Sequence, residues 1–357
     1  MTPRKTIFAM LSLTMLIAAP AEGRGGTVVI EDMDLDKGNV TALLEQTSQY
    51  YVDAMTRLVA ERYPDEYRPI RWEDLETAMT RNRVARVEYH FRVAGEERVR
   101  VYHAMGGEPL GIIGESIFEG PTRPVTPDTL DPSEDSGEGA SETSAASRSP
   151  AQREAADVAD EAFFTTFDDI DVRARVLPMD GSSLEPFQVE GWQGELDAEL
   201  KALRHIEHDI TTGSLPRGGR IDAKVGDILC QSCTEAMRSM AETYDVDIRA
   251  TQIYRTLPST KQKVLIQSGK ARLSRGRLVD VSNGRPLLAE DALTGAREAQ
   301  VRRSLSPRAM GRTFKGMSWQ GRSFKLGASS GPFPSPHPEE GRRPNHSDVE
   351  EPRPPEC

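Results

Sequence analysis

The pattern of hydrophobic and polar positions predicts two helices near the start of the chain. Between residues 39 and 62 apolar side chains recur every three, four or seven positions: Leu44, Tyr51, Met55, Leu58 and Val59. This spacing is typical of an amphipathic helix that buries one face. A shorter stripe formed by Trp72, Leu75 and Met79 predicts a second helix.

A β-hairpin is predicted next. In VARVEYHFRV, residues 84–93, apolar side chains alternate with charged ones, and the alternation resumes after the turn AGEE. We therefore expect residues 27–119 to form a small α+β module, whose role the sequence does not indicate. His90 and His103 lie on the two predicted strands and could face each other as metal ligands, although isolated histidines are more often ordinary surface residues.

A second region, residues 160–256, predicts strands and helices in the order ββαβαβ. FDDIDVRARVLP and LEPFQVEGW, separated by the turn MDGSS, predict a hairpin. A helix containing Leu200 follows and must end before Gly213 and Pro216. The strand GRIDAKV, a helix from Cys230 to Tyr244 and the strand VDIRATQIY complete the order. Such alternation predicts an α/β fold, with a sheet covered by helices.

Composition separates these regions from segments that we expect not to fold. Only 37% of the residues are hydrophobic, and 24 are prolines. Residues 120–159 lose aromatic residues and periodicity, which predicts a disordered acidic linker. We expect residues 257–357 to form a tail that is basic, then Pro-rich, and largely disordered.

The first residues have the layout of a cleavable secretory signal. Arg4 and Lys5 precede an apolar run and the small-residue end Ala19-Pro20-Ala21. We expect a signal peptide over residues 1–22 and a secreted protein. The alternative is an uncleaved anchor, but the apolar run is shorter than the roughly 20 residues that span a bilayer. No other stretch has that character, so no stable membrane span is expected after cleavage.

Charge is unevenly distributed along the chain. The formal net charge is −11, yet the segment from Lys261 to Gly327 contains 15 Lys and Arg against 4 Asp and Glu. Gly-Arg-x-Phe-Lys occurs there at Gly311 and at Gly321, with Trp319 between. Cations with interleaved aromatics suit single-stranded nucleic acid. The alternative is a disordered cationic tail that attracts any polyanion or membrane surface.

Two of the three cysteines form a Cys230-x-x-Cys233 pair at the start of a predicted helix. Free backbone N–H groups and the helix dipole lower thiol pKa values there, which favours metal binding. Two thiolates leave a zinc ion short of ligands, because a catalytic zinc commonly takes three protein groups and one water. The preceding helix offers two triplets that could supply the third: Asp197-Ala198-Glu199 and His205-Ile206-Glu207.

The motifs DAELKAL and LCQSC, which open consecutive predicted helices on either side of a strand, resemble a known arrangement. In zinc-dependent base deaminases the third ligand and a Glu lie two residues apart at the start of one helix, and a cysteine pair opens the next. The two motifs are similar to those of secreted bacterial toxin deaminases of the cytidine deaminase-like superfamily. This resemblance covers residues 160–256 and implies a cytidine deaminase-like α-β-α sheet domain.

The position of each triplet favours the first. Almost no helix can follow His205-Ile206-Glu207 before Gly213, whereas Asp197 is followed by about three turns. Carboxylate oxygen is an accepted zinc ligand. Two departures from the family pattern are Leu229, where a proline is usual, and Asp197, where a His is commoner.

The resemblance implies a role for each of these residues. Asp197, Cys230 and Cys233 would hold Zn, and Glu199 would be the catalytic proton shuttle. It also implies a nucleic acid or nucleotide substrate, single-stranded or with the base flipped out. A cognate immunity protein is the partner that such toxins generally imply.

Simpler interpretations accompany each residue. Asp197 could cap its helix, Glu199 could be a solvated acid, and His205, Glu207 and His208 could form the solvated face of the helix. The cysteine pair could instead be an exported thiol-disulfide centre. A third alternative is a non-catalytic secreted effector or binding protein with an inherited deaminase fold.

Overall fold

A computed structural model of the protein describes most of the chain between residues 25 and 311. The described residues are 25–64, 72–119, 148–178, 181–184, 196–311, 318–319 and 322–323. The predicted signal peptide, most of the predicted linker and the Pro-rich end lie outside them. Within the described residues no helix combines the length and apolar character that a membrane span needs.

The chain divides into two units, one ending at Thr313 and one beginning at Phe314. In the second unit β9 (Ser318–Trp319) pairs antiparallel with β10 (Arg322–Ser323). Everything below concerns the first unit.

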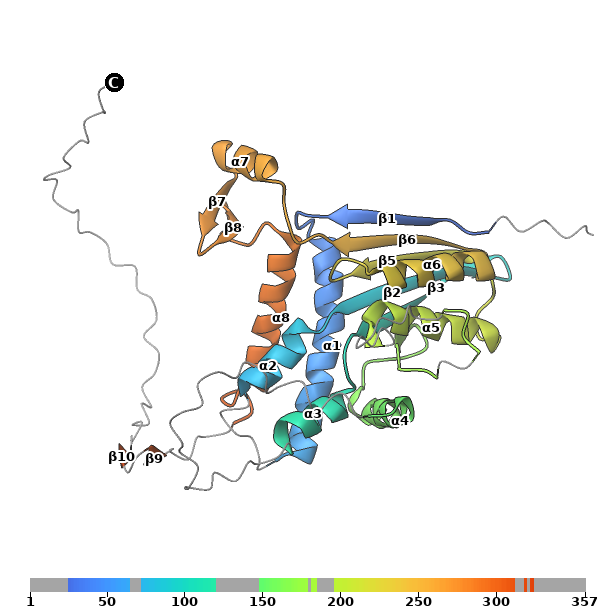
Figure 1. The fold of residues 1–357 in the computed structure, drawn as a ribbon, viewed down its shortest axis with the longest axis horizontal. Helices are drawn as coiled ribbons and strands as arrows, with labels where there is room; N and C mark the ends of the chain where they lie inside the picture. Colours follow the sequence, from blue (N-terminus) through green and yellow to red (C-terminus); the bar gives the residue numbers. More distant parts are fainter. Residues whose placement is uncertain are drawn as a thin grey trace, which may run out of the picture. The chain divides into compact units, whose positions relative to one another are not determined.

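The first unit is a mixed α/β structure built on a six-stranded sheet of order β1-β6-β5-β2-β3-β4 (Figure 1). Its strands are β1 (Val28–Met33), β2 (Val84–Val93), β3 (Glu96–Met105), β4 (Asp171–Arg173), β5 (Gly219–Val225) and β6 (Val246–Ile253). Three neighbouring pairs are parallel: β1 with β6, β5 with β6, and β3 with β4. Strand β2 runs antiparallel to both β5 and β3.

Helices complete the unit. They are α1 (Asn39–Arg62), α2 (Trp72–Arg81), α3 (Leu110–Phe118), α4 (Pro150–Asp160), α5 (Ala198–Thr211), α6 (Gln231–Tyr244), α7 (Ser259–Gln267) and α8 (Ala289–Leu305). A single 3-10 turn, η2 (Glu161–Phe163), follows α4. The short strands β7 (Ala271–Ser274) and β8 (Arg277–Asp280) form a separate antiparallel pair.

Two hydrophobic cores flank the sheet. Helices α5 and α6 pack on one face, where Tyr102 and Ala104 of β3 are buried in their core. Between these two residues His103 points to the other face, and its Nδ1 lies 2.8 Å from Oγ1 of Thr47 on α1. The second core gathers α1, α2, α3 and α8. The expected sheet with helices on its faces is therefore present as a mixed α/β fold.

The sheet joins two regions that the hydrophobic pattern treated as separate modules. Strands β1, β2 and β3 come from residues 27–119, whereas β4, β5 and β6 come from residues 160–256. A two-stranded hairpin is marginally stable alone. Here β2 gains a second neighbour in β5, and β1 pairs with β6. The physical reason for the difference is that strand pairing connects residues far apart in sequence.

The hairpin predicted within residues 167–192 lies partly outside the described residues. Its first strand is present as β4, which is three residues long and pairs parallel with β3. Of LEPFQVEGW, only Leu184 lies within the described residues. The hairpin of this sheet is β2–β3, which the sequence placed in the other module.

Parts of two segments expected to be disordered are folded, and the prediction is wrong for those parts. Residues 150–160 form α4, which begins with a capping box between Ser149 and Gln152. Residues 257–305 contain α7, β7, β8 and α8. Helix α8 packs on α1 although it has little amphipathic pattern, because Arg297 is buried and donates to the Met79 carbonyl and the Ser48 hydroxyl.

Candidate metal centre

The first turn of α5 carries the first candidate triplet. Asp197 is the N-cap residue in extended conformation, and its side chain makes no capping hydrogen bond. Its backbone carbonyl accepts from Lys201 N–H at 3.0 Å, which starts the helix. The expectation that the Asp197 carboxylate caps the helix is therefore wrong, and this carboxylate turns toward the cysteines instead.

The cysteine pair begins α6. Cys230 is its N-cap residue, and its Sγ accepts a hydrogen bond from the Cys233 N–H at 3.2 Å. The two Sγ atoms lie 3.0 Å apart, beyond the about 2.05 Å of a disulfide. Both are free thiols, one half-buried and one buried.

These two helix starts bring three ligand atoms together. Asp197 Oδ2 lies 3.5 Å from the Sγ of Cys230 and 3.5 Å from that of Cys233. Zinc at about 2.3 Å from sulfur and about 2.1 Å from oxygen, with tetrahedral angles, separates a sulfur from the oxygen by about 3.6 Å. The sulfurs would have to move apart to the about 3.8 Å expected across such an ion. Asp197, Cys230 and Cys233 thus form a group that could hold a metal ion.

Glu199 lies behind this group on the same helix turn. It is 1% exposed, and its Oε2 is 3.9 Å from Cys233 Sγ. Its other oxygen, Oε1, has no hydrogen-bond partner among the described residues. Burial, together with the nearby Asp197 charge, raises the pKa of Glu199 to about 7. The expectation that Glu199 is a solvated acid is wrong.

The remaining ionisable groups respond to one another. The hydrogen bond between the two thiols lowers the pKa of Cys230 and raises that of Cys233, whose burial adds to the rise. Burial raises the pKa of Asp197, although hydrogen bonds with both thiols lower it. The half-buried Cys230 is therefore the more acidic thiol of the pair.

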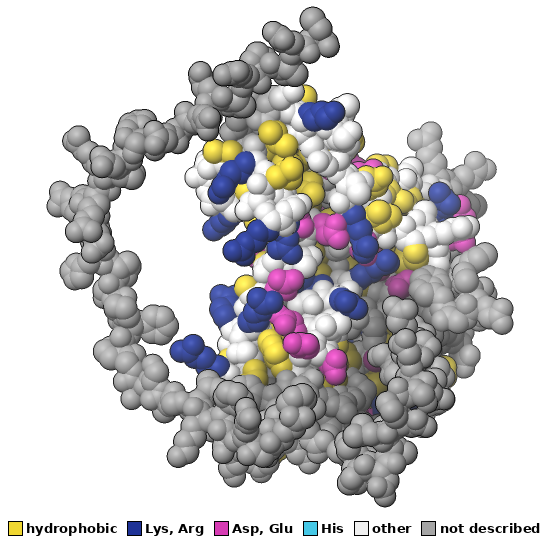
Figure 2. Space-filling view, turned by 60° about the vertical axis from the view of Figure 1, so that its left-hand side comes forward, with side chains coloured by type: hydrophobic (Ala, Val, Ile, Leu, Met, Phe, Trp, Pro, Cys, Tyr) yellow, Lys and Arg dark blue, Asp and Glu magenta, His cyan; other side chains and the backbone are white. Residues whose placement is uncertain are grey.

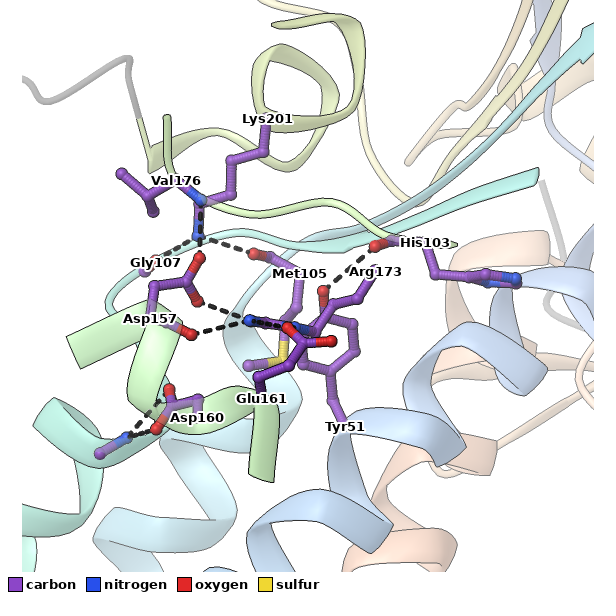
Figure 3. Close-up of polar contacts among 11 residues, drawn as sticks. Tyr51, His103, Met105, Gly107, Asp157, Asp160, Glu161, Arg173, Val176 and Lys201 are labelled. Atoms are coloured by element: carbon purple, nitrogen blue, oxygen red, sulfur yellow. Dashed lines mark hydrogen bonds and ion pairs between the residues drawn. The ribbon is translucent and has the colours of Figure 1, made fainter. Parts of the chain in front are cut away.

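Lys201 of the DAELKAL motif holds the start of α5 against the end of β3 (Figure 3). Its buried Nζ donates to the Met105 carbonyl at 3.0 Å and to the Gly107 carbonyl at 2.7 Å. Gly107 N–H in turn donates to the Leu196 carbonyl at 2.9 Å. Burial lowers the pKa of Lys201. The start of α5 is thereby held at two points: at Leu196, which precedes Asp197, and at Lys201.

Beside Lys201, ion pairs anchor α4 and the segment after it (Figure 3). Arg173 donates to Asp157 Oδ1 at 2.7 Å and to Glu161 Oε2 at 2.7 Å, and Val176 N–H donates to Asp157 Oδ2 at 2.7 Å. Asp160 accepts from the Gly111 N–H at 2.9 Å. Sequence reasoning missed this cluster, because its residues lie in segments assigned to a linker and to a hairpin.

A charged cleft of about 470 Å³ lies near the metal group, since two of its lining residues carry charges that act on Glu199. Arg83 and Asp227 line it, and their side chains lie 2.8 Å apart. The Arg83 charge lowers the pKa of both Asp197 and Glu199. Arg255, a further lining residue, also pairs with Asp227. A cleft of this size is within the range of small-ligand sites.

The second triplet has a structural role. Glu207 is buried and accepts from Ser182 and Ser183 hydroxyls and from the Tyr244 hydroxyl at 2.9 Å. His205 is also buried, with its ring 5.6 Å from that of Tyr102. The expected solvated face is therefore wrong for these two residues, whereas His208 is exposed as expected.

The two strand histidines do not face each other. In the β2–β3 register His103 is opposite Arg86, and His90 is opposite Val99. His103 is fully buried, with Nε2 2.9 Å from Asp171 Oδ1. It is neither part of a metal pair with His90 nor a surface residue.

Comparison with protein-family models, with curated proteins and with solved structures finds no significant match to this chain. The chemistry of the site has to be argued from its own residues.

Proposed function

We propose that the protein is a secreted zinc-dependent deaminase toxin or effector that hydrolyses the exocyclic amine of cytosine or adenine in nucleic acid. The observation that supports it most is the convergence of Asp197, Cys230 and Cys233 on one point, with the buried Glu199 beside them. The resemblance of DAELKAL and LCQSC to toxin deaminases gives this convergence a chemical interpretation.

Two features support a metal at this point, and zinc in particular. Two thiol sulfurs and one carboxylate oxygen are a donor set that zinc accepts. Glu199 Oε1 is a buried acceptor without a hydrogen-bond partner among the residues that the structure describes. When bound, zinc would lower the pKa of a water molecule, so that a hydroxide nucleophile is available at neutral pH.

Glu199 is the residue we assign to proton transfer. It would accept a proton from the attacking water and deliver it to the ring nitrogen of the base. A second proton would pass to the amine, which leaves as ammonia while the carbon it occupied becomes a carbonyl. The burial of Glu199 keeps bulk water away from these transfers.

The substrate would be reached as an unpaired base, because the target atom is hidden in a duplex. The cleft beside Arg83 and Asp227 offers cations and acids for the polar edge of a base or its phosphate. Export from the producing cell and a cognate immunity protein remain part of the proposal, by analogy with the resembled toxins.

A thiol-disulfide protein is the second candidate, and one observation favours it. A half-buried Cys230 with a lowered pKa next to a buried Cys233 with a raised pKa is suited to disulfide exchange. This candidate leaves the position of Asp197 and Glu199 without a function.

One experiment separates the two candidates. The chain from residue 23 onward, without the expected signal peptide, is produced in a bacterial cytoplasm, together with its variants Glu199→Gln, Cys233→Ser and the control Glu207→Gln from the second triplet. Zinc content and base changes in DNA and RNA are then measured. We expect about one zinc in all but Cys233→Ser, and base changes only in the parent and Glu207→Gln. Zinc-free protein without any Glu199-dependent base change would refute the deaminase.

A further inference from the structure

Residues 257–288 form a small module, here named the basic hairpin module, that contains α7, β7 and β8. In Figure 1 it lies at one end of the sheet, beyond the ends of β1 and β6. Its own core consists of only three fully buried side chains: Leu257, Ala271 and Leu278. The module therefore has much surface and little interior.

Apolar side chains are exposed on α7, on β7 and just after β8. Helix α7 has no buried residue at all. Four aliphatic side chains are more than a third exposed: Val264 (62%), Ile266 (39%), Leu273 (63%) and Val281 (51%). A nine-residue helix is marginal without packing of an apolar face. Exposed apolar surface that is grouped in this way marks an interaction site.

The charge of the module is almost entirely positive. Between residues 257 and 288 there are seven Lys and Arg but one acid, Asp280. Lys261 and Arg277 pair with acids outside the module, Asp34 and Asp291.

Five cations of the module are left over for a partner. Within the part of the chain that the structure describes, no ion pair involves Lys263, Lys270, Arg272, Arg275 or Arg285. Figure 2 brings this side forward and shows Lys and Arg side chains distributed around apolar ones in its upper part. The surface is complementary to a dense array of negative charge.

The chemistry of the apolar residues decides which anionic partner fits. Single-stranded nucleic acid is bound by aromatic side chains on which bases stack. The module contains no Phe, Tyr or Trp. Aliphatic side chains gain free energy when they enter the acyl boundary of a bilayer, and neighbouring Lys and Arg gain from anionic headgroups. Val264 follows Lys263, and Leu273 follows Arg272, so both kinds of contact occur on the same elements.

We propose that the basic hairpin module docks the protein on a bilayer rich in anionic lipid, with Val264 and Leu273 entering the interface and Lys263 and Arg272 contacting headgroups. This docking is independent of the deaminase proposal, because none of these residues lies at the metal group or in the charged cleft. Its failure would leave the deaminase proposal intact.

Sedimentation with vesicles tests the docking in the full-length chain. The vesicles contain phosphatidylcholine alone or phosphatidylcholine with phosphatidylglycerol. We expect binding to the anionic vesicles only. Val264→Asp with Leu273→Asp should weaken it by about tenfold or more, and so should Lys263→Glu with Arg272→Glu. All four side chains are exposed, so the variants should fold, which circular dichroism checks.

Matched controls keep the test specific. Val158→Asp with Ile170→Asp changes two equally exposed aliphatic residues outside the module, and should leave vesicle binding unchanged. A single-stranded oligonucleotide is titrated in parallel. Undiminished vesicle binding by the Val264 and Leu273 variant would overturn the proposal. It would also be overturned if Lys263 and Arg272 were needed for the oligonucleotide but not for the vesicles.

Discussion

Two triplets that end in Glu, Asp197-Ala198-Glu199 at the start of helix α5 and His205-Ile206-Glu207 within it, have different surroundings. At its start, Asp197 and Glu199 turn toward the two thiols of α6 and form few hydrogen bonds of their own. Two turns later, His205 and Glu207 are also buried, and Glu207 accepts from three hydroxyl donors. Among the described residues Glu199 Oε1 has no hydrogen-bond partner, whereas both oxygens of Glu207 have one; in the second triplet it is His205 Nδ1 that lacks a partner.

This difference between the two glutamates indicates which of them is available for chemistry. A buried polar group in a folded protein is normally hydrogen-bonded, so an unsatisfied one requires a reason. For Glu199 the reason we propose is a missing partner at the metal group. For Glu207 the reason for burial is structural, since it joins α5 to α6 and to residues 182–183.

The largest expected effect is on zinc affinity, and its absence would contradict the assignment of the metal group to the first triplet. Asp197→Ala should weaken zinc binding by more than about 100-fold, because it removes a direct ligand. His205→Ala should leave the zinc affinity unchanged. Competition with a chromogenic chelator measures both affinities. Loss of zinc in the His205 variant would instead assign the site to the second triplet.

For the free energy of unfolding we expect the opposite order: changes in the second triplet should matter more than changes in the first. Glu207→Ala is expected to lower the free energy of unfolding by about 3 kcal/mol, because the Tyr244 hydroxyl and two Ser hydroxyls lose a buried acceptor. Glu199→Gln in the metal-free protein should lower it little, since Oε1 has no partner to lose within the described part of the chain. Urea denaturation measures both values. Glu235→Ala, which removes only a bond from Gln231, is the control.

Acidification should act through the second triplet. Burial lowers the pKa of His205 to about 4, against the charge of Asp209, from an ordinary value of 6.5. The unfolded chain therefore binds the proton more tightly, and stability is lost as the pH falls from about 6.5 toward about 4. We expect His205 to account for roughly 2 kcal/mol between about pH 7.5 and about pH 5. Urea denaturation of His205→Gln should show a smaller loss over this range; an identical loss would exclude His205 as the cause.

The smallest effect is expected at the exposed end of the same helix. His208→Ala should change the free energy of unfolding by less than about 0.5 kcal/mol and should leave zinc binding unchanged, because its side chain is exposed. Parallel urea denaturation and chelator competition check this. A larger change would show that the His208 side chain makes a stabilising contact and does not belong to the solvated face of α5.

Local periodicity predicted individual elements well. The helix predicted over residues 39–62 is α1, Asn39–Arg62, and the helix predicted from Cys230 is α6, Gln231–Tyr244. Both have a clear apolar stripe, which depends only on neighbouring residues. The prediction failed for α8, whose buried face includes Arg297 and Gln300 and therefore lacks such a stripe. Charged residues that are buried with partners cannot be recognised from sequence alone.

The sequence by itself determined the elements near the site and the residue types with metal-binding and acid-base chemistry. Only the tertiary structure decided that β2 pairs with β5, so that one sheet includes both predicted modules. The sequence favoured the Asp197 triplet by its position on the helix, but only the tertiary structure brings Asp197 to Cys230, across 33 positions of chain. Periodicity reports the interactions of near neighbours, whereas burial and ligand geometry depend on contacts between distant residues, which exist only after the chain has folded.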